Sequence, residues 1–247
     1  MKQSMMSVAL AMGLAAGAVQ AQTTEGWSFE VTPFVWYAGL EGDLKVAGRS
    51  IDFEKDAADL LDAAEVGGSV RLGAAYDRFV IGALVDYFSL STDELDEEDQ
   101  PRAGTVDSKM LLAEALAGYR VDGWAEGQSF VLALGVRNLS LDTDLKSNGG
   151  ASFSDDREIT DLMFYVLPSV PLFSSSIDGL RFNPVLGIGS GDSDLAYEMF
   201  PQVQYDVNDA LSVRFGYRRV GWRFEGNDDN EFNADLAGLI LGVGFKY

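Results

Sequence analysis

Large apolar side chains alternate with polar or small ones along most of this chain. A strand turns successive side chains to opposite faces, so such alternation indicates a strand with one apolar face. The last nine residues, Leu239–Tyr247, show it most clearly, because every second position from Leu239 is a large apolar residue. The pattern predicts ten strands, within 27–46, 66–76, 79–87, 111–120, 130–137, 161–166, 180–188, 195–205, 211–218 and 239–247.

The composition of the two faces predicts which face points outward. The polar faces are rich in Gly and Ala and carry isolated charges, as the crowded inside of a narrow barrel requires. Aromatic residues stand near strand ends, where interfacial girdles belong: Trp27, Tyr37, Tyr76, Tyr87, Tyr119, Tyr205 and Tyr247. The fold class is therefore predicted to be all-β, an antiparallel transmembrane β-barrel with apolar residues outside. Two soluble alternatives stay open: a sandwich with one wet face, and a lipocalin-like barrel that binds a small apolar ligand.

Connection lengths predict the topology. Short turns at Asp77–Arg78, Asp122–Gln128, Ser174–Gly179 and Asp206–Ala210 alternate with longer connections at Ala47–Glu65, Thr92–Gly104, Thr143–Arg157 and Gly226–Glu231. In membrane barrels the short turns are periplasmic and the long loops extracellular. The turn at Gly189–Asp194 is the short exception on the outer side.

Two features leave details of this topology open. Gly39 and Gly42 could break the first strand, so eight or twelve strands stay open beside ten. In the first outer loop, Phe53–Glu65 places apolar residues on one helical stripe and predicts a short amphipathic helix.

The first 21 residues have the order of a secretory signal peptide. Lys2 precedes an apolar run from Met5 to Val19, and small residues precede Gln22. This run is too short to span a bilayer as a helix. We expect cleavage near Ala21, which leaves residues 22–247 as one outer-membrane barrel domain. A membrane-anchoring helix is the alternative.

Charge and missing residue types exclude several functions. The 247 residues hold 18 Lys and Arg against 39 Asp and Glu, a formal charge of −21. This sign excludes nucleic-acid binding through phosphate neutralisation. The chain has no Cys and no His, which removes disulfides, Ser-His-Asp triads and His-ligated metals. We therefore expect no enzyme, no catalytic residue and no cofactor.

The inward charges are the candidate functional residues. They are Arg71, Asp86, Glu114, Arg137, Asp161, Arg181, Arg214 and Arg218. Lining a constriction, they would make a narrow porin-like channel for small solutes or ions. Paired with one another, they would instead fill the lumen and leave a structural or surface-interaction role, which is the favoured interpretation.

Acidic segments dominate the predicted outer loops: Asp93–Asp99, Ser154–Asp156, Asp192–Asp194 and Asn227–Glu231. Carboxylates are the oxygen ligands that Ca²⁺ and Mg²⁺ prefer, so divalent cations are possible partners there. None of the segments has the spacing of a Ca²⁺-loop motif, and a solvated, repulsive surface is the simpler interpretation.

Several short motifs together resemble a known class of protein. They are Thr32–Trp36 (TPFVW), Gly42–Val46 (GDLKV), Asp59–Leu61, Leu134–Leu145 (LGVRNLSLDTDL), Phe215–Arg219 (FGYRR) and the terminal LGVGFKY. The chain resembles small Gram-negative outer-membrane β-barrel proteins of the OmpA-like or OmpW-like kind, and most closely an uncharacterised group of such barrels. The resemblance covers residues 27–247.

The resemblance implies location and partners more than activity. It implies the outer membrane, contact with outer-membrane lipid and lipopolysaccharide, and recognition by the barrel-insertion machinery through Leu241, Val243, Phe245 and Tyr247. The chain ends in Tyr rather than the commoner Phe, which could slow insertion without changing the fold. A second Arg follows Gly-Tyr-Arg, another departure. The substrate, the surface partner and the oligomeric state are not determined by the sequence.

Overall fold

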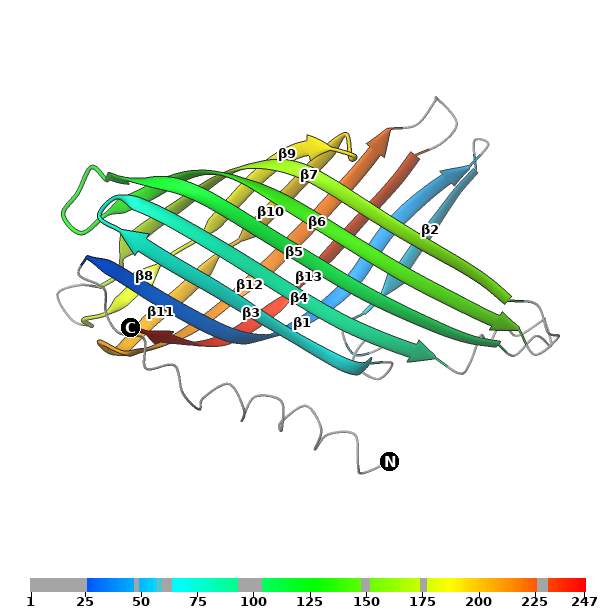
Figure 1. Cartoon of the computed structure of the whole chain (residues 1–247), viewed down its shortest axis with the longest axis horizontal. Helices are drawn as coiled ribbons and strands as arrows, with labels where there is room; N and C mark the ends of the chain where they lie inside the picture. Colours follow the sequence, from blue (N-terminus) through cyan, green and yellow to red (C-terminus); the bar gives the residue numbers. More distant parts are fainter. Residues whose placement is uncertain are drawn as a thin grey trace.

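A computed structural model describes residues 26–46, 49–56, 58, 64–92, 104–147, 152–173, 177–225 and 231–247. The described residues form thirteen β-segments (Figure 1). They are β1 (Trp27–Val46), β2 (Arg49–Lys55), β3 (Ala64–Tyr76), β4 (Phe79–Thr92), β5 (Gly104–Asp122), β6 (Ser129–Ser147), β7 (Ser152–Pro171), β8 (Leu180–Phe182), β9 (Val185–Gly191), β10 (Leu195–Phe200), β11 (Gln202–Asn208), β12 (Leu211–Glu225) and β13 (Glu231–Lys246).

The segments close into an antiparallel barrel of ten strands, as predicted. Consecutive strands pair along the chain, and β1 closes the wall by pairing with β13 on one side and β3 on the other. β8 and β9 both pair with β7 and form one interrupted strand, and β10 and β11 do the same against β12. The interruptions fall at Pro184 and Pro201, because proline has no N–H to give to a ladder.

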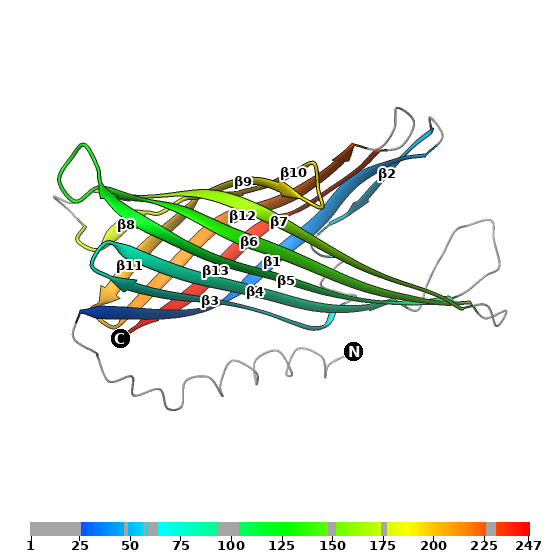
Figure 2. The same ribbon diagram turned by 45° about the horizontal axis from the view of Figure 1, so that its top comes forward.

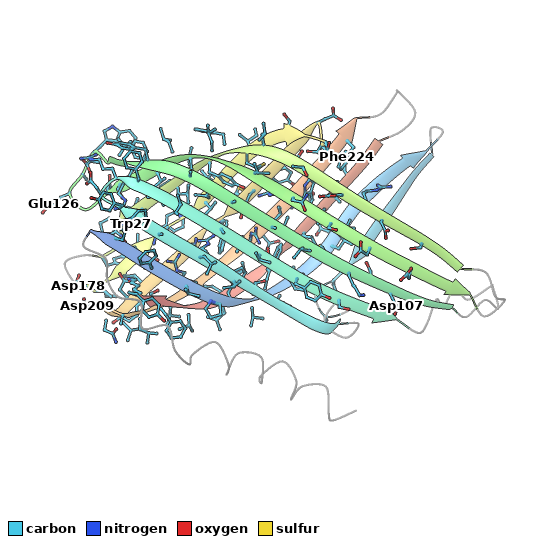
Figure 3. All side chains as sticks on the ribbon, in the orientation of Figure 1. Trp27, Asp107, Glu126, Asp178, Asp209 and Phe224 are labelled. Atoms are coloured by element: carbon cyan, nitrogen blue, oxygen red, sulfur yellow. The ribbon has the colours of Figure 1, made fainter. Side chains whose placement is uncertain are left out.

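The two ends of the barrel differ. In Figures 1 and 2 the start of β1 and the C-terminus lie at the end that holds the short turns. Glu126, Asp178 and Asp209 mark this end in Figure 3, and Asp107 and Phe224 lie toward the opposite end. β3–β7 form one wall, behind which β12, β13 and the outer part of β1 run with the opposite tilt (Figure 2). Both termini of the barrel therefore lie at the short-turn end.

The outer face is apolar, as predicted. Leu134 and Leu162 are each 70% exposed, and the large side chains of the same parity on neighbouring strands are exposed with them. A soluble lipocalin-like barrel would carry polar side chains on this face. The outward apolar face therefore contradicts that alternative and is typical of a membrane barrel.

The height of the apolar belt suits a bilayer. On β1, Trp27 and Tyr37 both face outward and stand ten residues apart. Ten residues span about 33 Å along a strand. A tilt of about 40° reduces this to about 25 Å, the height of the apolar band in outer-membrane barrels.

The predicted loop helix at Phe53–Glu65 is wrong at both ends. Phe53–Lys55 belongs to β2, which pairs with the outer half of β1, and β3 begins at Ala64. β1 pairs with β3 only as far as Phe34. The backbone groups of β1 from Leu40 onward therefore pair with β2 instead. Between the two strands the structure describes Asp56 and Ala58, and Ala58 is α-helical, whereas residues 57 and 59–63 lie outside the described residues.

The predicted loop at Thr143–Arg157 is also too long. β6 continues to Ser147 and β7 begins at Ser152, so the acidic segment Ser154–Asp156 is part of a strand. Ladder hydrogen bonds between the two strands outweigh the low strand preference of Asp and Ser. Within the described residues, no helix is both long and apolar enough to cross a membrane.

Candidate functional site

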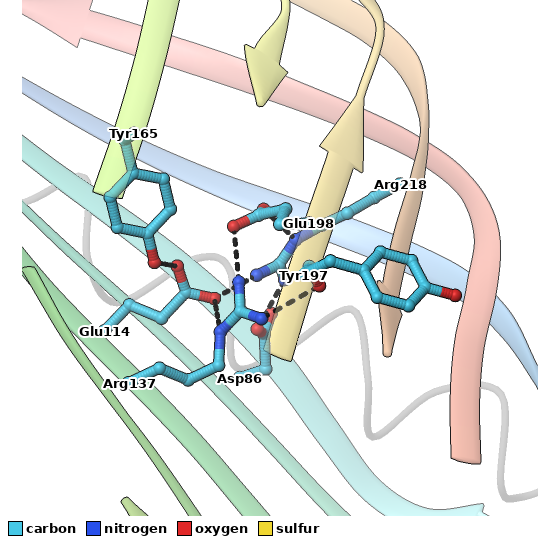
Figure 4. Close-up of polar contacts among 7 residues, drawn as sticks. All are labelled: Asp86, Glu114, Arg137, Tyr165, Tyr197, Glu198 and Arg218. Atoms are coloured by element: carbon cyan, nitrogen blue, oxygen red, sulfur yellow. Dashed lines mark hydrogen bonds and ion pairs between the residues drawn. The ribbon is translucent and has the colours of Figure 1, made fainter. Parts of the chain in front are cut away.

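Arg218 on β12 points into the barrel lumen and is completely buried. Its Nε donates to Glu198 Oε1 on β10 at 2.8 Å. Its Nη1 donates to Asp86 Oδ2 on β4 at 2.7 Å, and its Nη2 donates to Glu114 Oε1 on β5 at 2.6 Å. One guanidinium therefore holds carboxylates from three strands (Figure 4).

Arg137 on β6 completes the network. Its Nη2 donates to Glu198 Oε2 at 2.7 Å, and its Nε lies 3.3 Å from Glu114 Oε1 as an ion pair. Its Nη1 donates to the backbone oxygen of Tyr197 at 3.0 Å. Both arginines thus share Glu114 and Glu198.

A phenol and two indoles surround these ions. The hydroxyl of Tyr165 on β7 donates to Glu114 Oε2 at 2.9 Å. The Trp36 ring lies 4.8 Å from Arg218 Cζ, and the Trp222 ring lies 5.9 Å from Arg137 Cζ, both within cation–π range.

We call Asp86, Glu114, Arg137, Tyr165, Glu198 and Arg218 the lumen ion cluster. All six residues are between 0% and 7% exposed. Three carboxylates face two guanidiniums, a formal charge of −1. Removing one partner would leave another charge buried and unpaired, which costs about 3–5 kcal/mol. The cluster therefore acts as a brace, meaning that its hydrogen bonds and ion pairs connect six strands across the lumen.

The fold places the cluster through strand parity and through glycine. Arg218 pairs with Gly238 on β13, and Glu198 pairs with Gly187 on β9. A Cβ at Gly238 would overlap the backbone of Tyr37 and Ala38, and one at Gly187 would lie 2.7 Å from the Tyr165 ring. Gly187 therefore leaves room for the Tyr165 ring of the cluster, and Gly238 lets β1 lie close against β13 beside Arg218.

Four of the eight predicted lumen residues meet in this cluster: Asp86, Glu114, Arg137 and Arg218. Arg71 lies instead over the Phe200 ring, 5.5 Å from Cζ to the ring centroid. The Asp161 carboxylate accepts from the N–H and hydroxyl of Ser193, so it fastens the turn between β9 and β10.

The two remaining arginines lie toward the short-turn end. Arg181 donates to the Ser169 hydroxyl at 2.9 Å and to the Gly127 backbone oxygen at 2.8 Å. Arg214 pairs with Glu30, which links β12 to β1. Both residues tie strands together and stand apart from the lumen ion cluster.

Two members of the cluster were not among the predicted site residues. Glu198 alternates with Tyr197 and Met199, so its parity already indicated an inward position. Tyr165 shares the parity of Asp161, against the outward Leu162 and Phe164. Parity could have found both, but it gives the face of a residue and not its partners across the barrel.

Neither a protein-family model nor a curated protein matches the chain. Among solved structures it is similar to Ail, the attachment invasion locus protein of Yersinia pestis, at 12% identity and a TM-score of 0.38, over 91% of this chain and 100% of that one. It is also similar to the translocator domain of the autotransporter NalP from Neisseria meningitidis, at 14% identity and a TM-score of 0.49, over 97% and 96%. The toluene transporter TodX of Pseudomonas putida gives 8% identity and a TM-score of 0.36, over 91% and 90%. At these identities the likeness concerns the fold alone.

Three of the four predicted insertion-signal residues lie on the closing strand β13, and Tyr247 directly follows it. Leu241 and Val243 face outward on β13, and Phe245 follows at the same parity. The backbone of Tyr247 exchanges two hydrogen bonds with Phe29 at the start of β1, at 2.9 and 3.1 Å. The terminal residue thus completes the seam that closes the barrel.

The described residues hold no group of three or more metal-ligating side chains that could bind a metal ion. The acidic segments Asp93–Asp99 and 227–230 lie outside the described residues. In the acidic turn Asp192–Asp194, the Asp192 carboxylate accepts a hydrogen bond from the Thr160 backbone N–H at 2.8 Å.

Proposed function

We propose that this protein is an outer-membrane barrel of a Gram-negative cell whose lumen is filled by side chains. In this proposal its role is structural or one of surface interaction, and it is neither an enzyme nor an open pore. The observation that carries the proposal is the lumen ion cluster, which joins β4, β5, β6, β7, β10 and β12 inside the barrel.

The outer face supports the membrane placement. Apolar side chains cover the middle of the barrel wall, and exposed aromatic residues bound this belt near both ends: Trp27, Tyr76, Tyr119, Tyr205 and Tyr247 at the short-turn end, and Tyr37, Tyr87 and Tyr217 toward the other. Such a face would be an aggregation surface in water, but it matches hydrocarbon flanked by two interfaces.

The burial of the cluster supports a closed lumen. Arg218 and Arg137 together make five ion-pair contacts with three carboxylates. A water-filled path through the same section would have to separate several of them in a low-dielectric interior. We infer that the resting barrel excludes ions, and that the working surface is the one exposed outside the cell.

The proposed partners follow from this placement. They are outer-membrane lipid, lipopolysaccharide and the barrel-insertion machinery, with divalent cations at acidic outer segments such as Asp93–Asp99. Deleting Asp93–Asp99 should weaken Ca²⁺-dependent binding to lipopolysaccharide-coated surfaces. Unchanged binding would remove that segment from the proposal.

Single-channel recording tests the closed lumen. Refolded protein without residues 1–21 is inserted into a planar bilayer, and insertion is checked by protease protection in vesicles of the same lipid. We expect a silent wild type and measurable steps from Arg218→Ala, because this change removes the cation that holds three carboxylates. Arg78→Ala at the short-turn end is the matched control and should stay silent.

Frequent conductance steps from the wild type would overturn the closed lumen and favour the narrow channel. If Arg218→Ala then changed the selectivity, the pore would pass through the cluster. A wild type that fails to insert at all would overturn the membrane placement instead.

A further inference from the structure

The barrel carries a second charged group, and it faces outward. Arg219 and Arg223 on β12 share the parity of the exposed Phe215 and Tyr217. Asp235 on β13 shares the parity of the exposed Leu239 and Leu241. Figure 4 shows the ring of Tyr197 pointing away from the lumen ion cluster. We call Tyr197, Arg219, Arg223 and Asp235 the outward arginine cluster.

The contacts inside this cluster fix both guanidiniums. Arg219 Nη2 and Arg223 Nη2 donate to Asp235 Oδ2 at 2.8 and 2.7 Å. The Tyr197 oxygen accepts from Arg219 Nε at 3.3 Å and from Arg223 Nη2 at 3.0 Å, and its hydroxyl donates to Asp235. Two cations therefore share one carboxylate.

A glycine makes room for this arrangement. Gly221 lies between the two arginines on β12 and pairs with Tyr197 on one side and Asp235 on the other. A Cβ at Gly221 would lie 2.5 Å from the Tyr197 ring. Because the residue is glycine, the ring can lie across β12, and Arg223 Cζ stands 5.2 Å from the ring centroid.

The cluster lies at the outer edge of the apolar belt. Arg219 follows Tyr217 by one outward position on β12 and pairs with Met199 on β10, which is 51% exposed. Charged side chains on the lipid face are tolerated near the interface and disfavoured at the bilayer centre. The same strands thus offer apolar contact for acyl chains beside a cationic group at headgroup height.

Within the part of the chain that the structure describes, Arg219 makes its hydrogen bonds and ion pairs through Nε and Nη2, and its side chain is 35% exposed. Asp235 is 9% exposed beneath the two arginines, so the guanidiniums cover its charge. Glu41 on β1 lies 3.8 Å from Arg219 Nη2 at the rim and is 56% exposed. An incoming anion would meet the remaining donors of Arg219, with Glu41 as the opposing charge.

We propose that the outward arginine cluster binds a phosphate group on the headgroup of an outer-leaflet lipid, whose acyl chains lie against the apolar belt below. Arginine offers its planar fork to phosphate oxygens with charge-assisted hydrogen bonds. The proposal rests on the proposed membrane placement, but it is independent of whether the lumen conducts.

Lipid titration of the folded protein in detergent tests this site. The probes are lipid A with both phosphates and the same lipid after phosphate removal, scored by native mass spectrometry. We expect the phosphorylated lipid to bind the wild type about tenfold more tightly, the lower end of the range for one charge-assisted hydrogen bond. Inorganic phosphate alone should not compete, because it has no chains to contact the belt.

Two variants with opposite expected signs sharpen the test. Arg219→Gln should remove most of the preference for the phosphorylated lipid. Glu41→Gln should increase it, because the opposing charge is gone. Arg78→Gln, which removes an arginine at the other end of the barrel, is the matched control and should bind like the wild type.

Equal binding of the two lipids to the wild type, or unchanged preference in Arg219→Gln, would overturn the site. If Arg219→Gln does not fold, the test rests on Glu41→Gln. In that case an unchanged or weaker preference of Glu41→Gln for the phosphorylated lipid would contradict the proposal. Efficient competition by inorganic phosphate would show an anion site without a lipid. A protein that binds phosphorylated lipid but conducts ions would overturn only the closed lumen, whereas failure to insert into vesicles would remove the placement that both proposals share.

Discussion

Arg218 Nη1 and Asp86 Oδ2 lie 2.7 Å apart across the barrel, although 132 positions separate the two residues in the chain. Both side chains are completely buried. The contact joins β12, near the end of the chain, to β4, in its first half. Because β4 and β12 are not neighbours in the wall, the contact bridges the lumen between them.

Removing the Arg218 charge should destabilise the folded barrel strongly. Arg218→Leu leaves Asp86, Glu114 and Glu198 with one fewer cation, and we expect a loss of about 3–5 kcal/mol in the free energy of unfolding. Urea unfolding in lipid vesicles measures it. Arg218→Lys keeps a positive charge but not the guanidinium that contacts three carboxylates, so its loss in the free energy of unfolding should be smaller.

Arg78→Ala is the control for this change. Arg78 donates to Asp122 at 2.8 Å in the short-turn region, a bond that raises the pKa of Arg78. Both side chains are well exposed, so the free energy of unfolding should change little. Equal losses for Arg218→Leu and Arg78→Ala would contradict the assignment of the lumen ion cluster as the brace.

Two glycines on the inner face should respond differently to one added methyl group. A Cβ at Gly238 would overlap the backbone of Tyr37 and Ala38 at the closing seam, whereas a Cβ at Gly73 would meet open space. We expect Gly238→Ala to cost about 1–3 kcal/mol and Gly73→Ala to stay within about 0.5 kcal/mol. The same vesicle unfolding measurement checks both, and a neutral Gly238→Ala would show that the seam is looser than the register indicates.

Asp161 should control the stability of the turn between β9 and β10. Its Oδ1 accepts from the Ser193 N–H at 3.0 Å and from the Ser193 hydroxyl at 2.8 Å. Asp161→Ala leaves both donors without this acceptor, a local cost of about 1–3 kcal/mol. Hydrogen exchange of residues 191–195 should accelerate, while exchange in β5 stays unchanged. Equal acceleration in both places would indicate a global effect.

The terminal residue should matter for closure through its backbone more than through its ring. Tyr247 exchanges two main-chain hydrogen bonds with Phe29, and its side chain faces outward. Deleting Tyr247 should slow folding into vesicles, whereas Tyr247→Phe should fold as the wild type does. Gel mobility of unheated samples over time follows the folded fraction. Normal folding of the deletion would show that the seam closes without this pair.

The wall of the barrel follows from the sequence because it depends on local periodicity. Side chains of Leu239–Tyr247 must alternate whatever the partner strand is, and the same holds for the nine other predicted strands. The tight turn at Asp77–Arg78 is local as well, whereas the breaks at Pro184 and Pro201 interrupt two strands that the pattern predicted as continuous. Strand number, direction and the outward apolar face could therefore be predicted.

The local sequence pattern gave wrong predictions where pairing with another strand determined the structure. Phe53–Lys55 fits a helical stripe, yet it pairs with β1 because the pairing of that strand with β3 ends at Phe34. Ser154–Asp156 has the composition of a loop, yet it lies opposite β6. In both segments, backbone hydrogen bonds supplied by another strand outweigh the preference of the residues themselves.

By itself, the sequence determined most of the wall, the inward face of charges such as Arg218 and the absence of histidine and cysteine side chains. The tertiary structure alone decided that Arg218 meets Asp86, Glu114 and Glu198, and that Arg219, one residue later, meets Tyr197 and Asp235 on the opposite face. The physical reason is that alternation along a strand fixes which face of the wall each side chain points to. The height of a side chain along the barrel axis and its contact partners depend instead on the register of all ten strands around the closed barrel.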